Sequence, residues 1–114
     1  MSVGYHIIAD LKCENVSLLM TKNEMEEVME EAIRKGNLTR ISSDYHQFYP
    51  YGVSGVILLA ESHLSFHSFP EYSLLTVDVY SCGERREERV TMAYDYIIEK
   101  FGAEEVNKWV LERG

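Results

Sequence analysis

The feature that most constrains the fold is the run "VSGVILLA", residues 53–60, which is the most apolar stretch of the chain. Its odd and its even positions are both mostly apolar, so a β-strand here presents apolar side chains on both of its faces. A strand of this kind is typical of a sheet that is covered on both sides. The rest of the chain, or a partner, must therefore supply two covering layers.

Two segments have the periodicity of helices. In "TKNEMEEVMEEAIRKG", Thr21 and Glu24 form a capping box and Gly36 suits the C-terminal end. The predicted inner stripe of this first helix is Met25, Val28, Met29, Ala32 and Ile33. A second helix is predicted after Gly83 and ends at Gly102. Its inner stripe is Val90, Ala93, Tyr94, Ile97, Ile98 and Phe101.

The remaining segments predict strands. They are residues 4–11, 38–48, 53–60, 61–69 and 72–83, with a short final strand within 103–113. This order predicts an α+β fold, a two-layer α/β sandwich in which two helices cover one face of a mostly antiparallel sheet. Because the helices leave the opposite face open, we expect a second copy to pack against it, sheet to sheet, in a symmetric dimer.

Composition restricts the class of protein. With 114 residues, the chain is expected to form one domain, residues 1–114. Its net charge of -8 would repel a phosphate backbone, so no nucleic-acid partner is expected. Two cysteines make neither a disulfide framework nor a zinc site. Without a secretory signal or a long apolar segment, the expected location is the cytoplasm, with no membrane contact.

Reactive side chains are concentrated in "LLAESHLSFHSFPEYSLLTVDVYSCG", residues 58–83. Alternation predicts that Leu75, Val77, Val79 and Ser81 face the helices. The opposite face would carry His63, Ser65, His67 and Phe69 together with Thr76, Asp78, Tyr80 and Cys82. Alternation is least reliable for Ser62, which lies at a junction between two strands.

Residue types alone leave several interpretations of this segment open. The polar positions are equally typical of a solvent-exposed face, and Cys82 of a small packed side chain. A hydrolase triad lacks the G-x-S-x-G turn around Ser62. Glu61, His63 and His67 have the right atoms for a metal, but their spacing matches no strong zinc pattern, so no metal is predicted.

Residues 48–83, "FYPYGVSGVILLAESHLSFHSFPEYSLLTVDVYSCG", resemble the prokaryotic S-adenosylmethionine decarboxylase proenzymes, a family of pyruvoyl-dependent decarboxylases. The resemblance lies in "PYGVSGV", in "ESH" with a histidine five residues after its serine, in "PEY", and in "VD" followed by an aromatic residue and "CG". "GYHIIAD" near the start agrees as well, so the resemblance spans essentially the whole domain.

The resemblance implies that the chain cleaves itself. The hydroxyl of Ser62 would attack the carbonyl of Glu61 in an N-to-O acyl shift. β-Elimination would then separate a β chain, residues 1–61, from an α chain, residues 62–114. Ser62 would become a pyruvoyl group, the only cofactor expected.

The resemblance also implies roles for three further residues. His67 would accept the Cα proton during processing, and Ser54 would assist the acyl shift. The pyruvoyl group would form a Schiff base with S-adenosylmethionine and release CO2, with Cys82 as proton donor. The product is the aminopropyl donor for spermidine synthesis.

For the substrate, the resemblance implies that Phe48 and Phe69 stack on the adenine and that Glu71 holds the ribose. Related enzymes often have tryptophan at the position of Phe69, so the smaller ring offers less area for stacking. The expected assembly is a homodimer of processed protomers.

Two alternatives remain open at this stage. A pyruvoyl-dependent decarboxylase of arginine or another basic amino acid would use the same scaffold, and both kinds of substrate are cationic. A homologue that never cleaves itself would act as a binding or partner subunit.

Overall fold

The computed structural model describes residues 2–114, which form six strands, two α-helices and two short 3-10 helices. In chain order they are β1 (Gly4–Cys13), η1 (Val16–Leu19), α1 (Lys22–Lys35), β2 (Arg40–Gln47), β3 (Val53–Leu59), β4 (Ser62–Phe69), η2 (Pro70–Tyr72), β5 (Leu74–Cys82), α2 (Arg86–Phe101) and β6 (Ala103–Arg113). The predicted order of strands and helices is confirmed, with boundaries that differ by a few residues.

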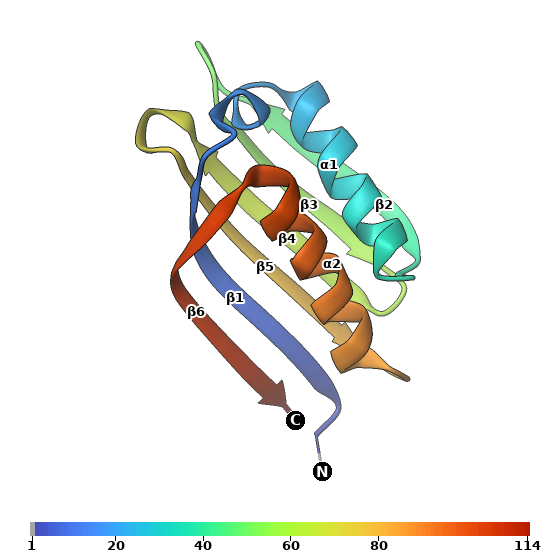
Figure 1. The fold of residues 1–114 in the computed structure, drawn as a ribbon. Coiled ribbons are helices and arrows are strands. Elements are labelled where there is room, and N and C mark those ends of the chain that lie inside the picture. Colours follow the sequence, from blue (N-terminus) through green and yellow to red (C-terminus); the bar gives the residue numbers. More distant parts are fainter. Residues whose placement is uncertain (1) are drawn as a thin grey trace.

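The strands form one antiparallel sheet in the order β2-β3-β4-β5-β1-β6. The first strand of the chain therefore lies inside the sheet, where Ile7 is opposite Val79 of β5 and Val110 of β6. Helices α1 and α2 lie side by side across one face (Figure 1). The predicted two-layer sandwich is thus confirmed.

The ends of both helices follow from their sequence. The side chain of Thr21 accepts a hydrogen bond from the backbone N–H of Glu24, and its hydroxyl donates to the Glu24 carboxylate at 2.9 Å. This contact satisfies a backbone donor that a helix start leaves free. Helix α2 ends at Gly102, whose φ of +56° suits a residue without Cβ.

The core lies between the helices and the sheet. Every member of the predicted helical stripes is buried except Ile98, which is partly buried. The side chains of Leu64 and Phe66 on β4 and of Val77 and Val79 on β5 point to the same layer, as alternation predicted. Within residues 2–114, no helix combines the length and the apolar character needed to cross a membrane.

The single chain leaves one expectation open and contradicts another. Strand β3 is covered on one face only, since Val56 and Leu58 are 45% and 49% exposed on the face away from the helices. The reason is that α1 and α2 both pack on the other side. The final strand is not short. β6 has 11 residues because it pairs with β1 along nearly all of that strand's length.

Candidate active site

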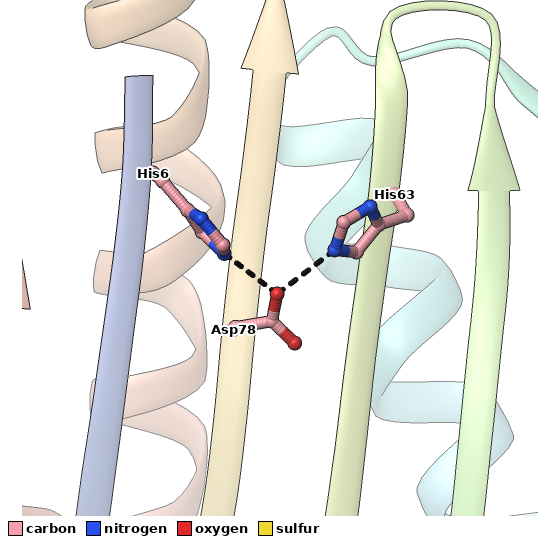
Figure 2. Close-up of side chains that lie close together, drawn as sticks. All are labelled: His6, His63 and Asp78. Atoms are coloured by element: carbon pink, nitrogen blue, oxygen red, sulfur yellow. Dashed lines mark hydrogen bonds and ion pairs between the residues drawn. The ribbon is translucent and has the colours of Figure 1, made fainter. Parts of the chain in front are cut away.

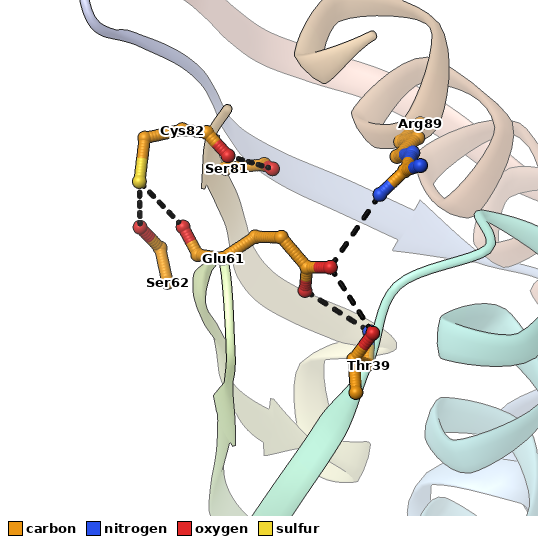
Figure 3. A network of polar contacts seen from close by, with 6 residues as sticks. All are labelled: Thr39, Glu61, Ser62, Ser81, Cys82 and Arg89. Carbon is orange, nitrogen blue, oxygen red and sulfur yellow. Dashed lines mark hydrogen bonds and ion pairs between the residues drawn. The ribbon is translucent and has the colours of Figure 1, made fainter. Parts of the chain in front are cut away.

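The junction between β3 and β4 places a hydroxyl beside a polarised peptide carbonyl. The backbone N–H of Cys82, at the end of β5, donates to the carbonyl oxygen of Glu61 at 2.9 Å. The thiol of Cys82 donates to the same oxygen, also at 2.9 Å. The hydroxyl of Ser62 donates to the Cys82 sulfur at 3.7 Å (Figure 3). We call Glu61, Ser62 and Cys82 the junction cluster.

Two donors on one carbonyl oxygen have a chemical consequence. They stabilise negative charge on that oxygen, which develops when a nucleophile attacks the carbonyl carbon. The nearest hydroxyl along the chain is that of Ser62, in the next residue. The junction cluster therefore has the parts of an oxyanion site around the Glu61–Ser62 peptide bond.

The side chain of Glu61 is held separately, on the helix side of the sheet (Figure 3). Its carboxylate accepts hydrogen bonds from the backbone N–H and the hydroxyl of Thr39, at 3.0 and 3.1 Å. Arg89 of α2 approaches it to 3.4 Å. Sequence analysis did not identify Thr39 or Arg89, because no spacing along the chain connects residues 39, 61 and 89.

A second group of predicted residues gathers at the other end of β4. His67 on β4 is directly opposite Ser54 on β3, and the Nδ1 of His67 lies 2.7 Å from the Ser54 hydroxyl oxygen. Both side chains lie on the face away from the helices. They border a cleft of about 570 Å³ that is also lined by Phe48, Phe69 and Glu71. We call these five residues the cleft cluster.

The cleft has the properties of a small-molecule site. Its volume is in the range of ligand pockets. The rings of Phe48 and Phe69 are 48% and 37% exposed, so each has a free surface for a planar ligand. Glu71, on η2, adds a carboxylate that can accept hydrogen bonds from ligand hydroxyls.

The two clusters are far apart in one chain. His67 follows Ser62 by five residues along β4, and a strand rises about 3.3 Å per residue, so their Cα atoms are about 17 Å apart. The prediction that His67 and Cys82 share a face is confirmed by the strand pairing. Within one protomer, however, the structure does not bring His67 to Ser62.

A third polar group joins side chains of β1, β4 and β5 (Figure 2). Oδ2 of Asp78 on β5 accepts hydrogen bonds from Nε2 of His6 on β1, at 2.7 Å, and from Nε2 of His63 on β4, at 2.9 Å. Ser65 donates to the other oxygen. Burial raises the pKa of Asp78, but the hydrogen bonds from the imidazoles and the serine outweigh it, so the pKa falls to about 2.

Sequence analysis placed His63 and Asp78 on one face but did not connect them with His6, because the pairing of β1 with β5 is not visible in the sequence. The metal hypothesis is not supported by the geometry. The carboxylate of Glu61 points toward the helices. His63 binds Asp78, and His67 binds Ser54 at the far end of β4.

Comparison with known proteins extends these observations to the whole chain. Residues 5–114 match the family described as S-adenosylmethionine decarboxylase. The S-adenosylmethionine decarboxylase proenzyme of Picrophilus torridus is 48% identical over 114 residues, which are 100% of this chain and 86% of the relative. That of Archaeoglobus fulgidus is 40% identical over the full length of both chains. The crystal structure of the adenosylmethionine decarboxylase from Aquifex aeolicus has a TM-score of 0.92 and 43% identity, covering 99% of this chain and 92% of that one.

Proposed function

This chain belongs to the S-adenosylmethionine decarboxylase family, and we propose that it makes its own pyruvoyl cofactor by cleaving the bond between Glu61 and Ser62. The overall reaction is the release of CO2 from S-adenosylmethionine, which yields the aminopropyl donor for spermidine synthesis. The observation that carries the proposal is the junction cluster, where the Ser62 hydroxyl lies beside a carbonyl that already accepts two hydrogen bonds.

The conversion takes three steps, which are an acyl shift, an elimination and a hydrolysis. The Oγ of Ser62 attacks the Glu61 carbonyl carbon, the carbon–nitrogen bond breaks, and the nitrogen takes the proton, which converts the amide into an ester. The two donors of Cys82 stabilise the oxyanion formed in this step. Transfer of the Ser62 Cα proton to the imidazole of His67 then breaks the bond between Cβ and Oγ, leaving a carboxylate on Glu61. Water replaces the nitrogen of residue 62, which leaves as ammonia.

The junction cluster fits the resulting cofactor. A pyruvoyl group supplies a carbonyl that condenses with the substrate amine and accepts the electron pair left when CO2 departs. The Cys82 thiol lies 3.7 Å from the Ser62 hydroxyl oxygen, so it is next to the residue to which the substrate would be joined through its amine. Cys82 thus serves in cleavage as a hydrogen-bond donor and in turnover as the proton donor.

The cleft cluster supplies the substrate site. Phe48 and Phe69 offer the exposed ring surfaces on which an adenine would stack, and Glu71 would accept hydrogen bonds from the ribose hydroxyls. Arginine, the substrate of the first alternative, has no aromatic base to occupy the space between these rings. The cleft therefore favours S-adenosylmethionine.

The distance between the clusters supports an active site that is shared with a second copy of the chain. About 17 Å separates residues 62 and 67 along one strand, so His67 of the same protomer is out of reach of Ser62. Two protomers can pack with their open faces together. If the two-fold axis lies between the two sheets and is perpendicular to the strands, β4 of one protomer runs antiparallel to β4 of the other. The Ser62 end of one protomer would then lie over the His67 end of its partner.

The open face has the composition of such an interface. Val56 and Leu58 on β3 and Trp109 and Leu111 on β6 are apolar side chains that are between 44% and 49% exposed. Burial of exposed apolar side chains against a partner removes them from water and so favours association of the two chains. Each of the two active sites would then combine a junction cluster with the partner's cleft cluster.

Mass spectrometry of Ser62→Ala tests the cleavage. The purified wild-type chain should separate into fragments 1–61 and 62–114, whereas Ser62→Ala should remain one folded chain without decarboxylase activity. Ser17→Ala, a change of an exposed serine on η1, is the matched control and should cleave normally. Release of CO2 should be seen with S-adenosylmethionine and not with arginine. A Ser62→Ala chain with normal turnover would rule out the mechanism.

Mixing two inactive variants tests the shared site. His67→Ala alone and Ser62→Ala alone should each stay intact. When the two are coexpressed, a mixed dimer has one site with both Ser62 and His67, contributed by different chains. The His67→Ala chain should then be cleaved, and only that chain. If it stays intact in isolated mixed dimers, the site lies within one protomer.

A further inference from the structure

His63 directly follows residue 62, which would become the cofactor, so the position of His63 determines where the cofactor lies. We propose that Asp78, together with His63 and His6, forms a clamp that holds the new end of β4 and so positions the pyruvoyl group against Cys82. This inference depends on the proposed function, because the end of β4 becomes free only after cleavage. Asp78 and His6 are positioning residues in this proposal, since neither takes part in the reaction itself.

Cleavage removes a covalent support from β4. Before it, residues 60 and 61 connect the start of β4 to β3, and Cys82 holds the Glu61 carbonyl. Afterwards residue 62 has lost its N–H and carries no charge, so it has no strong group of its own to bind a neighbour. The first side chain of the strand that is held by a partner is His63, at 2.9 Å from Asp78.

Asp78 holds β4 at two points. One carboxylate oxygen accepts from His63 and the other from Ser65, so residues 63 and 65 are both tied to β5. These hydrogen bonds join an ionised carboxylate to neutral or cationic donors, the class that is about twice as strong as bonds between neutral groups. The carboxylate therefore reinforces the backbone pairing of β4 with β5 at the end where the strand would fray.

Further contacts hold Asp78 in turn. His6 is 7% exposed, and its Nε2 donates to Asp78 at 2.7 Å. Its Nδ1 lies 3.4 Å from the guanidinium of Arg113, the last residue of β6. The Arg113 guanidinium also lies 4.8 Å from the ring centre of Tyr80, and that ring packs against the imidazoles of His6 and His63. The clamp thus connects β6, β1, β5 and β4 in one chain of contacts.

The same cluster has the residue types of a metal site, but its contacts favour a clamp. The ligand atoms of His6, His63 and Asp78 lie within 4.8 Å of one another. However, three N–H or O–H donors already satisfy the carboxylate. Arg113 places a fixed positive charge beside His6, which opposes the binding of a cation. Metal binding is therefore the competing outcome of the test.

Positioning of this kind affects turnover more than substrate affinity. The adenosine site lies in the cleft cluster, whereas the clamp acts on the electrophile. Misplacement of a reacting group by about 1 Å can lower the rate by about 100-fold. Loss of the clamp should therefore lower kcat while KM stays nearly constant.

The experiment compares Asp78→Asn in cleaved and uncleaved protein. The asparagine keeps the shape of the side chain but presents one oxygen acceptor instead of two. In the cleaved enzyme, kcat for S-adenosylmethionine should fall about 10- to 100-fold, with KM within about twofold. Amide hydrogen exchange of residues 63–66 should rise about tenfold. In a Ser62→Ala background, the same change should raise exchange less than about threefold, because the link to Glu61 remains.

Asp10→Asn is the matched control. Asp10 lies on the same face of β1 as His6, and it accepts a hydrogen bond from Asn107. None of the hydrogen bonds described for residues 2–114 joins Asp10 to a residue of the clamp. Its substitution should leave kcat, KM and exchange unchanged. His63→Phe, which keeps a ring beside Tyr80 but has no N–H, should reproduce the effects of Asp78→Asn, and it serves the same purpose if Asp78→Asn does not fold.

The outcomes separate this inference from the proposed function. A wild-type chain that remains intact overturns both. Cleaved variants with normal kcat and normal exchange overturn the clamp alone. So does an equal rise of exchange in cleaved and uncleaved protein, because Asp78 would then stabilise the sheet in general. Elemental analysis provides the last outcome. If the wild type contains one metal ion per chain and Asp78→Asn contains none, the cluster is a metal site and not a clamp.

Discussion

The two faces of the sheet have different roles although they are built from the same strands. On β4, Leu64 and Phe66 point toward the helices and are buried, whereas His63 and His67 point to the open face. The helix-covered face is almost entirely apolar. The open face carries the cleft cluster, the side chain of Cys82 and the Asp78 group. Alternating residues of one strand thus separate the stability of the protomer from its chemistry.

This difference teaches why the open face is incomplete in one chain. A face that is covered by its own helices can be filled with apolar side chains, because the chain itself excludes water from it. A face that must admit a substrate keeps polar groups and a cleft, and its apolar positions stay exposed until a partner covers them. The predictions below test this division, beginning with the largest expected effect.

The sharpest test of the division uses two phenylalanines on one strand. Phe66→Ala, on the helix-covered face, should lower the free energy of unfolding by about 3–5 kcal/mol, because it leaves a cavity in the core. Phe69→Ala, on the open face, should cost less than about 1 kcal/mol but raise KM for S-adenosylmethionine. Urea denaturation and steady-state kinetics measure the two effects. Equal stability losses would contradict the division.

A charge on the open face should break the proposed dimer without unfolding the protomer. Leu58→Lys would place an unpaired charge in the interface, so we expect weaker association by about 100-fold or more, or about 3 kcal/mol. Light scattering should show a monomer, and self-cleavage should fall with it. Met92→Lys, at a 43% exposed position on α2, is the control and should remain dimeric. A monomeric wild-type enzyme with full activity would argue against the interface.

Acid should destabilise the open face through Asp78. Its pKa is lowered from 3.8 in the unfolded state to about 2 in the folded state. At pH values above the unfolded-state pKa, the ionised carboxylate therefore contributes about 2 kcal/mol to the free energy of unfolding. As the pH falls from about 4 to about 2, the unfolded state takes up the proton first and this contribution is lost. The stability of Asp78→Asn should change less over this interval, whereas Asp10→Asn should follow the wild type in acid titrations of unfolding.

The smallest expected effect concerns the helix-covered side. Thr21→Ala removes the side-chain acceptor at the start of α1 and should lower the free energy of unfolding by about 1 kcal/mol. Because no hydrogen bond or ion pair in the described part of the chain, residues 2–114, joins α1 to either catalytic cluster, kcat and the extent of cleavage should not change. Thr21→Ser keeps the hydroxyl and should restore most of the stability. A loss of cleavage in Thr21→Ala would show that the two faces are coupled.

Local features of the sequence were sufficient for the elements of the fold. Thr21, Gly36 and Gly102 mark the helix ends, and the alternation from residue 63 to residue 82 assigned side chains to the two faces correctly. Such features depend on neighbours three or four residues apart in a helix, or two apart in a strand. The family also followed from the sequence, because its blocks of residues lie in order along the chain.

The sequence by itself determined which residues can act and on which face they lie. Only the tertiary structure decided which of them meet. It placed β1 between β5 and β6, which brings His6 to Asp78, and it brought Thr39 and Arg89 to Glu61. It also separated His67 from Ser62 by the length of a strand. The physical reason is that strand order and register depend on pairing between distant segments, whereas periodicity records only what lies nearby along the chain.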